Sequence, residues 1–250
     1  MKIIYLTAGA AGMYCGSCMH DNTLAKALIQ LGHDVQLVPL YTPIRTDEVS
    51  VARRQVFFGG INVFLQQKYS LFRHLPSWLL RPLDQAWLLN WASQRSVRIQ
   101  AAELGELTLA MLQGRHGPLR QETDRLVDWI SDEQPDLVDF TNVLVAASAP
   151  ALRAKCSAKL VVTLQGDDIF LQELLPEYRE QALELIGQAA TAIDLFLVNS
   201  QYYADFMSDF LRLPREKFRV IPLGIDTSDF TRPPRASDES ASDSSAQFRS

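Results

Sequence analysis

The stretch KIIYLTAGAAGMYCGSCMHDNTLAKALIQLGHDVQLV, residues 2–38, decides the fold class of this chain. Its apolar run Ile3–Leu6 ends at small residues, which is typical of a parallel strand covered on both faces. A second apolar run, Val35–Leu40, predicts another strand. Strand, glycine-bearing loop, helix and strand within forty residues predict a βαβ unit.

The helix of this unit is predicted from apolar residues that recur at helical spacing between Leu24 and Leu31. Asp21 or Asn22 is the expected N-cap, and Gly32 the expected residue just after the helix.

The same alternation returns after an irregular middle. It predicts an α/β fold with a doubly wound, mostly parallel, Rossmann-like sheet and a helical, aromatic-rich insertion at about 45–115. Ligands of such sheets bind at the carboxyl ends of the strands. The remaining predicted elements are a helix around 126–130, a strand at 137–140, a helix at 143–153, a strand at 160–164, a helix at 177–190, a strand at 195–198, a helix at 200–211 and a strand at 218–221.

The composition is that of an ordinary globular protein, with 250 residues, 47% of them hydrophobic, and a net charge of -5. This mild acidity argues against a dedicated nucleic-acid partner. The apolar start is too short for a signal peptide, and no apolar run reaches the roughly eighteen residues of a membrane span. Three cysteines are too few for a disulfide framework. We therefore expect a cytoplasmic protein. Peripheral binding to the inner face of the membrane is an open alternative within that expectation.

The middle of the chain is basic and aromatic. Between Val49 and Ala102 it has seven basic residues and a single acid, Asp84, together with three of the four tryptophans. This pattern suits contact with an anionic membrane surface. It equally suits an insertion packed on the sheet, or cations that guide an anionic acceptor.

The composition changes after residue 230. Residues 231–250 contain six serines and Phe248 as their only large apolar residue. We expect a flexible linker or tail, which leaves 1–230 as the folded domain.

The loop after the first strand has Gly9, Gly12 and Gly16 ahead of a helix, where backbone N–H groups can receive a phosphate. The alternative is that these glycines only permit a tight turn.

Cys15 and Cys18 form a CxxC motif in this same loop. A dithiol just before a helix could carry redox chemistry. A zinc site would add His20 and the distant Cys156. The third interpretation is that both cysteines are small residues lining the loop.

Together with the opening βαβ unit, three later segments resemble family 4 glycosyltransferases of the GT-B fold. They are VVTLQGDDI at 161–169, LFLVNSQYYADFM at 195–207 and FRVIPLGIDTSDF at 218–230.

This resemblance implies two facing Rossmann-like domains, of which residues 1–230 would be the N-terminal, acceptor-side one. It also implies a retaining enzyme without a metal or other cofactor, with a nucleotide-sugar as co-substrate and a sugar or other hydroxyl compound as acceptor. The C-terminal, donor-binding domain of such an enzyme is absent from these 250 residues. We therefore expect the chain alone to be inactive and to need that domain as partner.

The resemblance also assigns site residues. Gly16 and Ser17, with Gly12, fall where family members meet the donor diphosphate and the acceptor. Gln165 stands where many members have a histidine, and is our candidate catalytic residue; its amide can bond a sugar hydroxyl but cannot titrate.

Three further candidates follow predicted strands. Asp168 matches an acid in the family loop, with Asp167 as its rival, and either carboxylate could instead cap the next helix. Asn142 could line the cleft or merely form a turn. Ser200 is a predicted N-cap as well as a candidate sugar or phosphate contact.

The sequence therefore predicts the N-terminal half of a retaining hexosyltransferase. A non-catalytic module that binds glycans or anionic membranes is the main alternative. A dinucleotide-dependent oxidoreductase is less well supported, because the strict GxGxxG motif is missing.

Overall fold

The computed structural model describes most of the chain outside the basic middle segment and the tail. The described residues are 1–9, 15–46, 49–53, 56–58, 101–225 and 227, without the side chains of 101–103. The tail at 231–250 and most of the basic, aromatic segment, including Trp78, Trp87 and Trp91, lie outside them.

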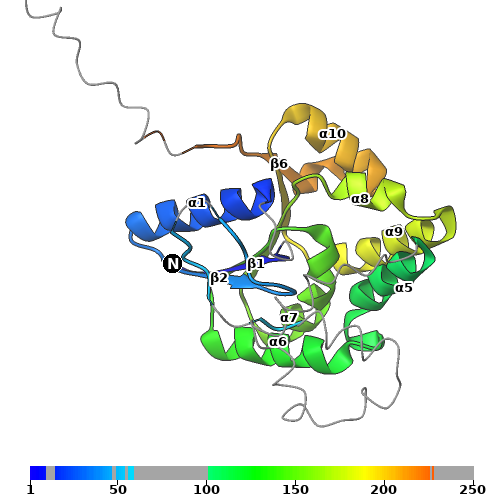
Figure 1. The fold of residues 1–250 in the computed structure, drawn as a ribbon, viewed down its shortest axis with the longest axis horizontal. Helices are drawn as coiled ribbons and strands as arrows, with labels where there is room; N and C mark the ends of the chain where they lie inside the picture. Colours follow the sequence, from blue (N-terminus) through cyan, green and yellow to red (C-terminus); the bar gives the residue numbers. More distant parts are fainter. Residues whose placement is uncertain (10–14, 47–48, 54–55, 59–100, 226, 228–250) are drawn as a thin grey trace, which may run out of the picture.

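Six parallel strands form one sheet in the order β2-β1-β3-β4-β5-β6 (Figure 1). The predicted α/β, doubly wound architecture is confirmed. The strands are β1 (Lys2–Thr7), β2 (Asp34–Pro39), β3 (Leu137–Phe140), β4 (Lys159–Thr163), β5 (Leu195–Val198) and β6 (Phe218–Val220).

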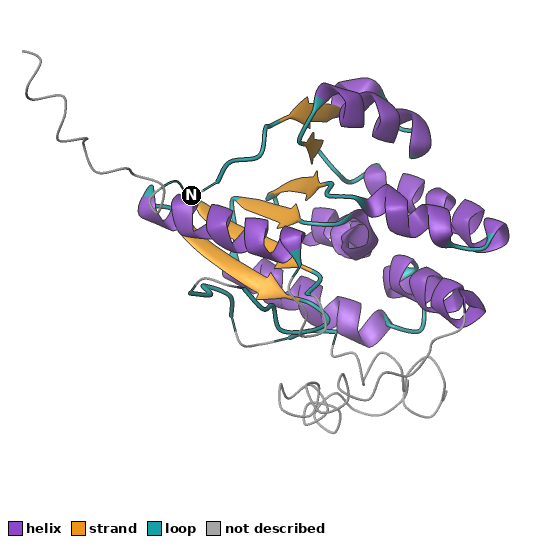
Figure 2. Ribbon diagram, turned by 45° about the horizontal axis from the view of Figure 1, so that its top comes forward, coloured by secondary structure: helices purple, strands orange, loops and turns teal. Residues whose placement is uncertain are grey.

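Helices cover both faces of this sheet (Figure 2). The α-helices are α1 (Gly16–Gln30), α5 (Ala101–Leu112), α6 (Arg120–Glu133), α7 (Ala149–Lys155), α8 (Asp167–Glu173), α9 (Pro176–Ala190) and α10 (Gln201–Phe210). Short 3₁₀ turns are η3 (Gly114–His116), η4 (Val143–Ser148) and η5 (Arg215–Lys217).

Alternate residues of each strand pack on different helices. Ile4 and Leu6 point into the large core that includes α6, α7, α9 and α10. Ile3 and Tyr5 face the other way, towards α1. Right-handed crossovers produce this division, because the chain moves one way from β1 to β2 and the opposite way from β3 to β6.

Two predicted helix boundaries are wrong. α1 begins at Gly16 with Cys15 as N-cap, so Asp21 and Asn22 lie inside the helix instead of capping it. The Asn22 side chain accepts a hydrogen bond from Val51 N and donates one to the carbonyl oxygen of Val49. These tertiary partners satisfy the Asn22 amide although it lies inside the helix. The predicted end is confirmed, since Gly32 adopts φ +86° just beyond α1.

The second wrong boundary lies after β3. The helix predicted at 143–153 is split into η4 and α7, and Pro150 lies in the first turn of α7. Proline has no backbone N–H to continue the hydrogen bonds of the preceding turn, so it favours a new helix start.

A search of the described residues finds no helix both long and apolar enough to cross a membrane.

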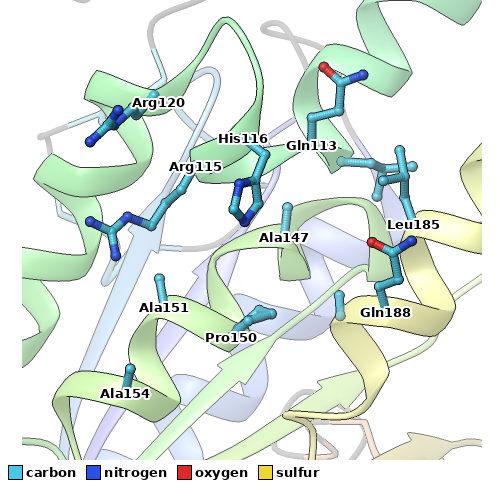
Figure 3. Close-up of a pocket in the computed structure, with 12 residues that line it drawn as sticks. Gln113, Arg115, His116, Arg120, Ala147, Pro150, Ala151, Ala154, Leu185 and Gln188 are labelled. Atoms are coloured by element: carbon cyan, nitrogen blue, oxygen red, sulfur yellow. The ribbon is translucent and has the colours of Figure 1, made fainter.

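The helical layer contains a cavity of about 630 Å³ between η3, α7 and α9 (Figure 3). His116 points into it towards Pro150, with Arg115 nearby. The Nε of Arg115 lies 2.5 Å from Asp124, whose other carboxylate oxygen lies 3.6 Å from Arg120, a second residue of the cavity lining. None of the residues predicted to bind substrate lines this cavity.

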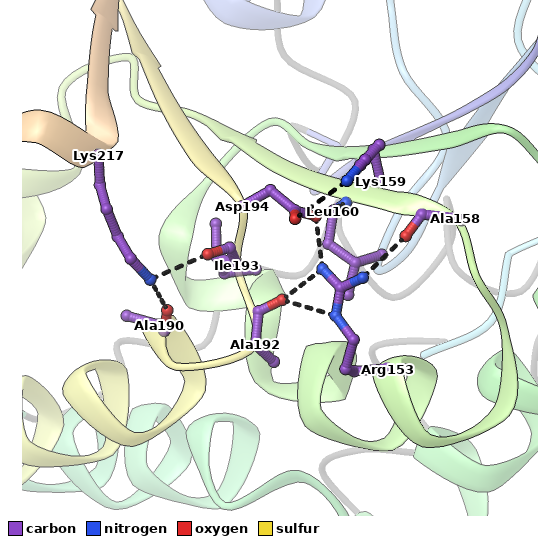
Figure 4. Close-up of polar contacts among 9 residues, drawn as sticks. All are labelled: Arg153, Ala158, Lys159, Leu160, Ala190, Ala192, Ile193, Asp194 and Lys217. Atoms are coloured by element: carbon purple, nitrogen blue, oxygen red, sulfur yellow. Dashed lines mark hydrogen bonds and ion pairs between the residues drawn. The ribbon is translucent and has the colours of Figure 1, made fainter.

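Polar contacts connect the amino-terminal ends of the strands, where β4 and β5 begin (Figure 4). Arg153 donates to the carbonyl oxygens of Ala158 and Ala192 and pairs with Asp194. Asp194 also accepts a hydrogen bond from Leu160 N at 2.8 Å. Burial raises the pKa of Asp194, but the Leu160 amide and Arg153 together lower it by more than burial raises it, so the net pKa is below the ordinary value.

Lys217 closes the C-terminal end of α9. Its Nζ donates to the carbonyl oxygens of Ala190 and Ile193 at 2.8 and 3.0 Å. A cation at a helix C-terminus satisfies carbonyls that have no partner within the helix.

We expect Lys217→Met to lower the free energy of unfolding by about 1–2 kcal/mol, because two carbonyl groups lose a charged donor. Lys155→Met is the matched control. It breaks an exposed ion pair with Asp128 and removes a solvent-exposed cation from the last turn of α7, where water replaces the lost contacts, so it should cost less than about 0.5 kcal/mol. Urea unfolding of both variants checks this, and equal losses would contradict it.

Candidate functional site

The carboxyl edge of the sheet has a switch point between β1 and β3, where the direction of winding reverses. Open α/β sheets bind ligands at such points. Every predicted site residue follows β1, β3, β4 or β5 in the sequence, either in the loop after the strand or in the first turn of the next helix, so the topology directs them all to this edge.

Beneath α1, the sheet has a buried polar row. The Thr163 hydroxyl lies 3.0 and 2.9 Å from the two carboxyl oxygens of Asp139 in β3 and donates its single hydrogen to this carboxyl group. Tyr5, its neighbour in β1, also hydrogen-bonds this carboxyl group. All three side chains are buried, on the face that α1 covers.

Burial changes how the carboxyl group of Asp139 titrates. It raises the pKa of Asp139 to about 7, although hydrogen bonds from Thr163 and Tyr5 lower it. The nearby Asp21 carboxylate adds to the rise. Burial, followed by the charge of Asp139, also raises the pKa of Tyr5.

Asp21 connects α1 to the loop after β4. The Nε2 of Gln165 donates to Asp21 Oδ1 at 2.9 Å. Asp21 is fully buried, and its Oδ2 has no hydrogen-bond partner among the residues described. The contact orients the Gln165 amide by its donor and leaves the carbonyl oxygen of that amide to accept a hydroxyl.

Asp167 ties two of the loops together. Its Oδ1 accepts from Val143 N at 2.6 Å and its Oδ2 from Gln165 N at 2.9 Å. Burial raises the pKa of Asp167 to about 6 against these hydrogen bonds. The N-cap of α8 is Gly166, in the left-handed region at φ 96°, so neither Asp167 nor Asp168 caps this helix.

Tyr203 makes a second bridge. Its hydroxyl donates to Asp168 Oδ1 at 2.7 Å and accepts from Gly166 N at 2.9 Å. Burial, then the hydrogen bond to Asp168, raises the pKa of Tyr203. Ser200 is the predicted N-cap, and its hydroxyl accepts from Tyr203 N at 3.2 Å.

The remaining candidates lie at the starts of helices. Gly16 is exposed at the first position of α1, and the Ser17 hydroxyl lies 2.9 Å from Cys15 Sγ. Asn142 caps η4, with its Oδ1 accepting from Leu144 N at 2.8 Å. Gly12 lies outside the described residues.

These contacts bring the predicted residues into linked groups. Asp168 and Ser200 meet through Tyr203, and Gln165 joins the helix of Gly16 and Ser17 through Asp21. Asn142 caps η4, and Asp167 accepts a hydrogen bond from Val143, the first residue of that turn.

Sequence reasoning missed Asp21 and Tyr203 as parts of the site. A signal for Asp21 was present, because Cys18, Asp21 and Ala25 recur at helical spacing along a face that proves to be buried. Tyr203 had no comparable signal, since its partner Asp168 is distant in the sequence.

The zinc hypothesis gains no support. Within the described part of the chain, no three His, Cys, Asp or Glu side chains gather in a way that could hold a metal ion.

Comparisons with known proteins give one match by sequence and several by structure. The profile of the family described as Glycosyltransferase Family 4 matches residues 100–229. No curated protein matches the chain in sequence.

Two of the solved structures with a similar fold are Anabaena HepE in complex with UDP and the glycosyltransferase SnogD from Streptomyces nogalater. HepE gives a TM-score of 0.46 at 16% identity, over 98% of this chain and 50% of that one. SnogD gives a TM-score of 0.37 at 14% identity, over 94% of this chain and 56% of that one. The chain thus spans about half the length of either structure.

The pKa of Asp139 generates a prediction about stability. The folded pKa of about 7 exceeds the ordinary 3.8, so the folded protein holds this proton more tightly than the unfolded chain does. The carboxyl group therefore reduces stability progressively as the pH rises from about 4 to about 7. Asp139→Asn keeps the shape of the side chain but has no carboxyl group to titrate. The free energy of unfolding of this variant, relative to the parent, should therefore increase from pH ~5 to pH ~8.

Urea unfolding at the two pH values measures this difference. Asp132→Asn, on the exposed face of α6, is the control and should show no such trend. A stability difference between Asp139→Asn and the parent that stays constant across this range would contradict the prediction.

Proposed function

Because the chain belongs to glycosyltransferase family 4, we propose that its Rossmann-like domain is the N-terminal, acceptor-side domain of a retaining GT-B enzyme. This enzyme transfers a hexose from a nucleotide diphosphate sugar to a hydroxyl acceptor, with a C-terminal domain that binds the donor. The family match over 100–229 supports the proposal most directly, because it spans the loops after β3, β4 and β5.

The start of α1 is the proposed contact for the donor diphosphate. The first N–H groups of a helix have no partner within the helix, and the helix dipole favours an anion there. Gly16 occupies the first position of α1 and is exposed. Ser17 adds a hydroxyl in the same turn.

The leaving diphosphate gains negative charge as the glycosidic bond to the nucleotide breaks. Backbone amides aimed at this charge stabilise the transition state more than the ground state. The proposal requires neither a metal nor a cofactor besides the nucleotide-sugar.

Gln165 and Asp168 are the proposed acceptor contacts. Asp21 accepts a hydrogen bond from one of the two amide N–H groups of Gln165, and we assign the carbonyl oxygen of that amide to accept a sugar hydroxyl. One oxygen of Asp168 holds Tyr203, and the other can accept a second hydroxyl. Asn142 and Ser200 are the remaining proposed substrate contacts, and their side chains already cap η4 and α10.

Fixing the acceptor in this way lowers the entropic cost of bringing its hydroxyl to the anomeric carbon. Asp21 and Tyr203 act through the residues they hold, so they are positioning residues.

A panel of nucleotide-sugars tests the division into two domains. The 250-residue chain alone should release no nucleotide diphosphate above buffer. The same chain joined to a donor-binding domain of the family should release it in the presence of an acceptor. Turnover by the chain alone, or no turnover by the joined protein with any donor, would overturn the proposal.

Gly16→Ala tests the diphosphate contact. A Cβ at Gly16 meets no atom of the described residues within 4 Å, so the fold should persist while the added methyl group obstructs the approach of a ligand. In the joined protein, we expect activity to fall at least ~tenfold, equivalent to about 1.4 kcal/mol of transition-state stabilisation.

The matched control is Gly187→Ala in α9, where an added Cβ also meets nothing within 4 Å in the part of the chain that the structure describes. This variant should keep full activity and gain up to about 1 kcal/mol of stability from better helix propensity. Activity in Gly16→Ala equal to that of the control would remove the diphosphate contact from this turn.

A further inference from the structure

We propose that Cys15 and Cys18 form a thiol–disulfide exchange site, in which Cys15 attacks a small-molecule disulfide and Cys18 resolves the mixed disulfide. This inference uses only the start of α1 and does not depend on the transfer reaction proposed above.

The two cysteines occupy different environments within one turn. Cys15 is the N-cap of α1 in an extended conformation and is partly exposed. Cys18 lies three residues further on and is only 2% exposed. An accessible sulfur ahead of a buried one is the arrangement that lets the first attack and the second resolve.

The surroundings of Cys15 favour its thiolate. Its Sγ lies 2.9 Å from the Ser17 hydroxyl. Partial burial raises the pKa of Cys15. Hydrogen bonds from the Ser17 hydroxyl, the amides of Cys18 and Ser17 and the Cys18 thiol together lower this pKa by more, so the net pKa is below the ordinary value. The helix dipole acts in the same direction.

Cys18 is kept in the thiol form. Burial, followed by the charge of Cys15, raises the pKa of Cys18 to about 12. The thiol group contacts Cys15 and also Thr7, the last residue of β1. A resolving cysteine of this kind stays inert until its neighbour has formed a mixed disulfide.

The two sulfurs are near enough to be joined. The two thiol groups already contact each other, and Cys15, the extended N-cap, directly precedes the turn that contains Cys18. A disulfide needs a Cβ separation of roughly 3.5–4.5 Å, which a small adjustment of this turn has to provide.

The proposed reaction balances in two steps. The Cys15 thiolate attacks one sulfur of the small disulfide, whose S–S bond breaks and releases one thiolate. Cys18 then gives its proton to that thiolate and attacks the Cys15 sulfur, which releases the second small thiolate. With the proton that Cys15 had lost, the two small products are thiols, and two protein thiols have become one disulfide at the expense of the oxidant.

Oxidised glutathione is the probe that tests the proposal. The reduced 250-residue chain is incubated with it near neutral pH, and protein mass and free thiols are followed with time. The parent should lose two of its three free thiols and keep no lasting adduct. Cys18→Ser should instead accumulate one glutathione adduct, located at Cys15 by peptide mapping.

Two further variants complete the design. Cys15→Ser should lose thiols at least ~tenfold more slowly than the parent, because the buried Cys18 is not reactive alone. Cys156→Ser, at a half-buried cysteine that follows α7, should behave as the parent does. Circular dichroism of each variant checks its fold, and Cys18→Ala replaces Cys18→Ser if the serine disturbs the core.

Three results would overturn the proposal. They are a Cys15→Ser variant that reacts at the parent rate, an adduct located at Cys156, and a parent protein that keeps a stable adduct at Cys15.

Discussion

The position of α1 over the carboxyl ends of β1, β3 and β4 depends on polar side chains that are buried beneath its first half. Its second half packs on the sheet through apolar residues such as Ala25 and Leu28. The first half is held instead by Asp21 and Asn22, whose partners lie in distant loops. Buried polar groups are costly unless they are hydrogen-bonded, so these contacts specify one placement of the helix. That placement determines where the turn containing Cys15, Gly16, Ser17 and Cys18 lies.

The two ends of the parallel strands hold their charged side chains in different ways. At the edge where β4 and β5 begin, Arg153, Asp194 and Lys217 pair every charge with a carbonyl or an opposite charge. At the carboxyl edge, Asp139 and Asp167 have raised pKa values through burial. Strongly perturbed carboxyl groups are more frequent at functional sites than elsewhere, and here they lie where the topology places a ligand.

The carboxyl edge behaves as one unit because short polar bridges cross between its loops. Asp167 joins the start of η4 to the loop after β4, and Tyr203 joins that loop to α10. A side chain in any of these loops is therefore positioned by residues of at least one other loop. Such cross-bracing gives a site the fixed geometry that binding and catalysis need.

The sequence by itself determined the fold class and most strand positions, and it predicted the edge of the sheet at which the candidate site residues lie. The strands predicted at 137–140 and 195–198 are those observed, because strands that pack between helices are made mostly of apolar residues, and Asp139 is the one polar residue among these eight. The cap at Ser200 was also predictable, since capping is a local interaction.

Only the tertiary structure decided where α1 begins and how the site residues are held. Asp21 and Asn22 were predicted as helix caps, because a polar residue ahead of an apolar run is locally a good cap. Asp21 instead bonds Gln165, 144 residues away in sequence, and Tyr203 bonds Asp168 across 35. No local pattern encodes such pairs, because their partners become neighbours only once the parallel strands bring their carboxyl ends together.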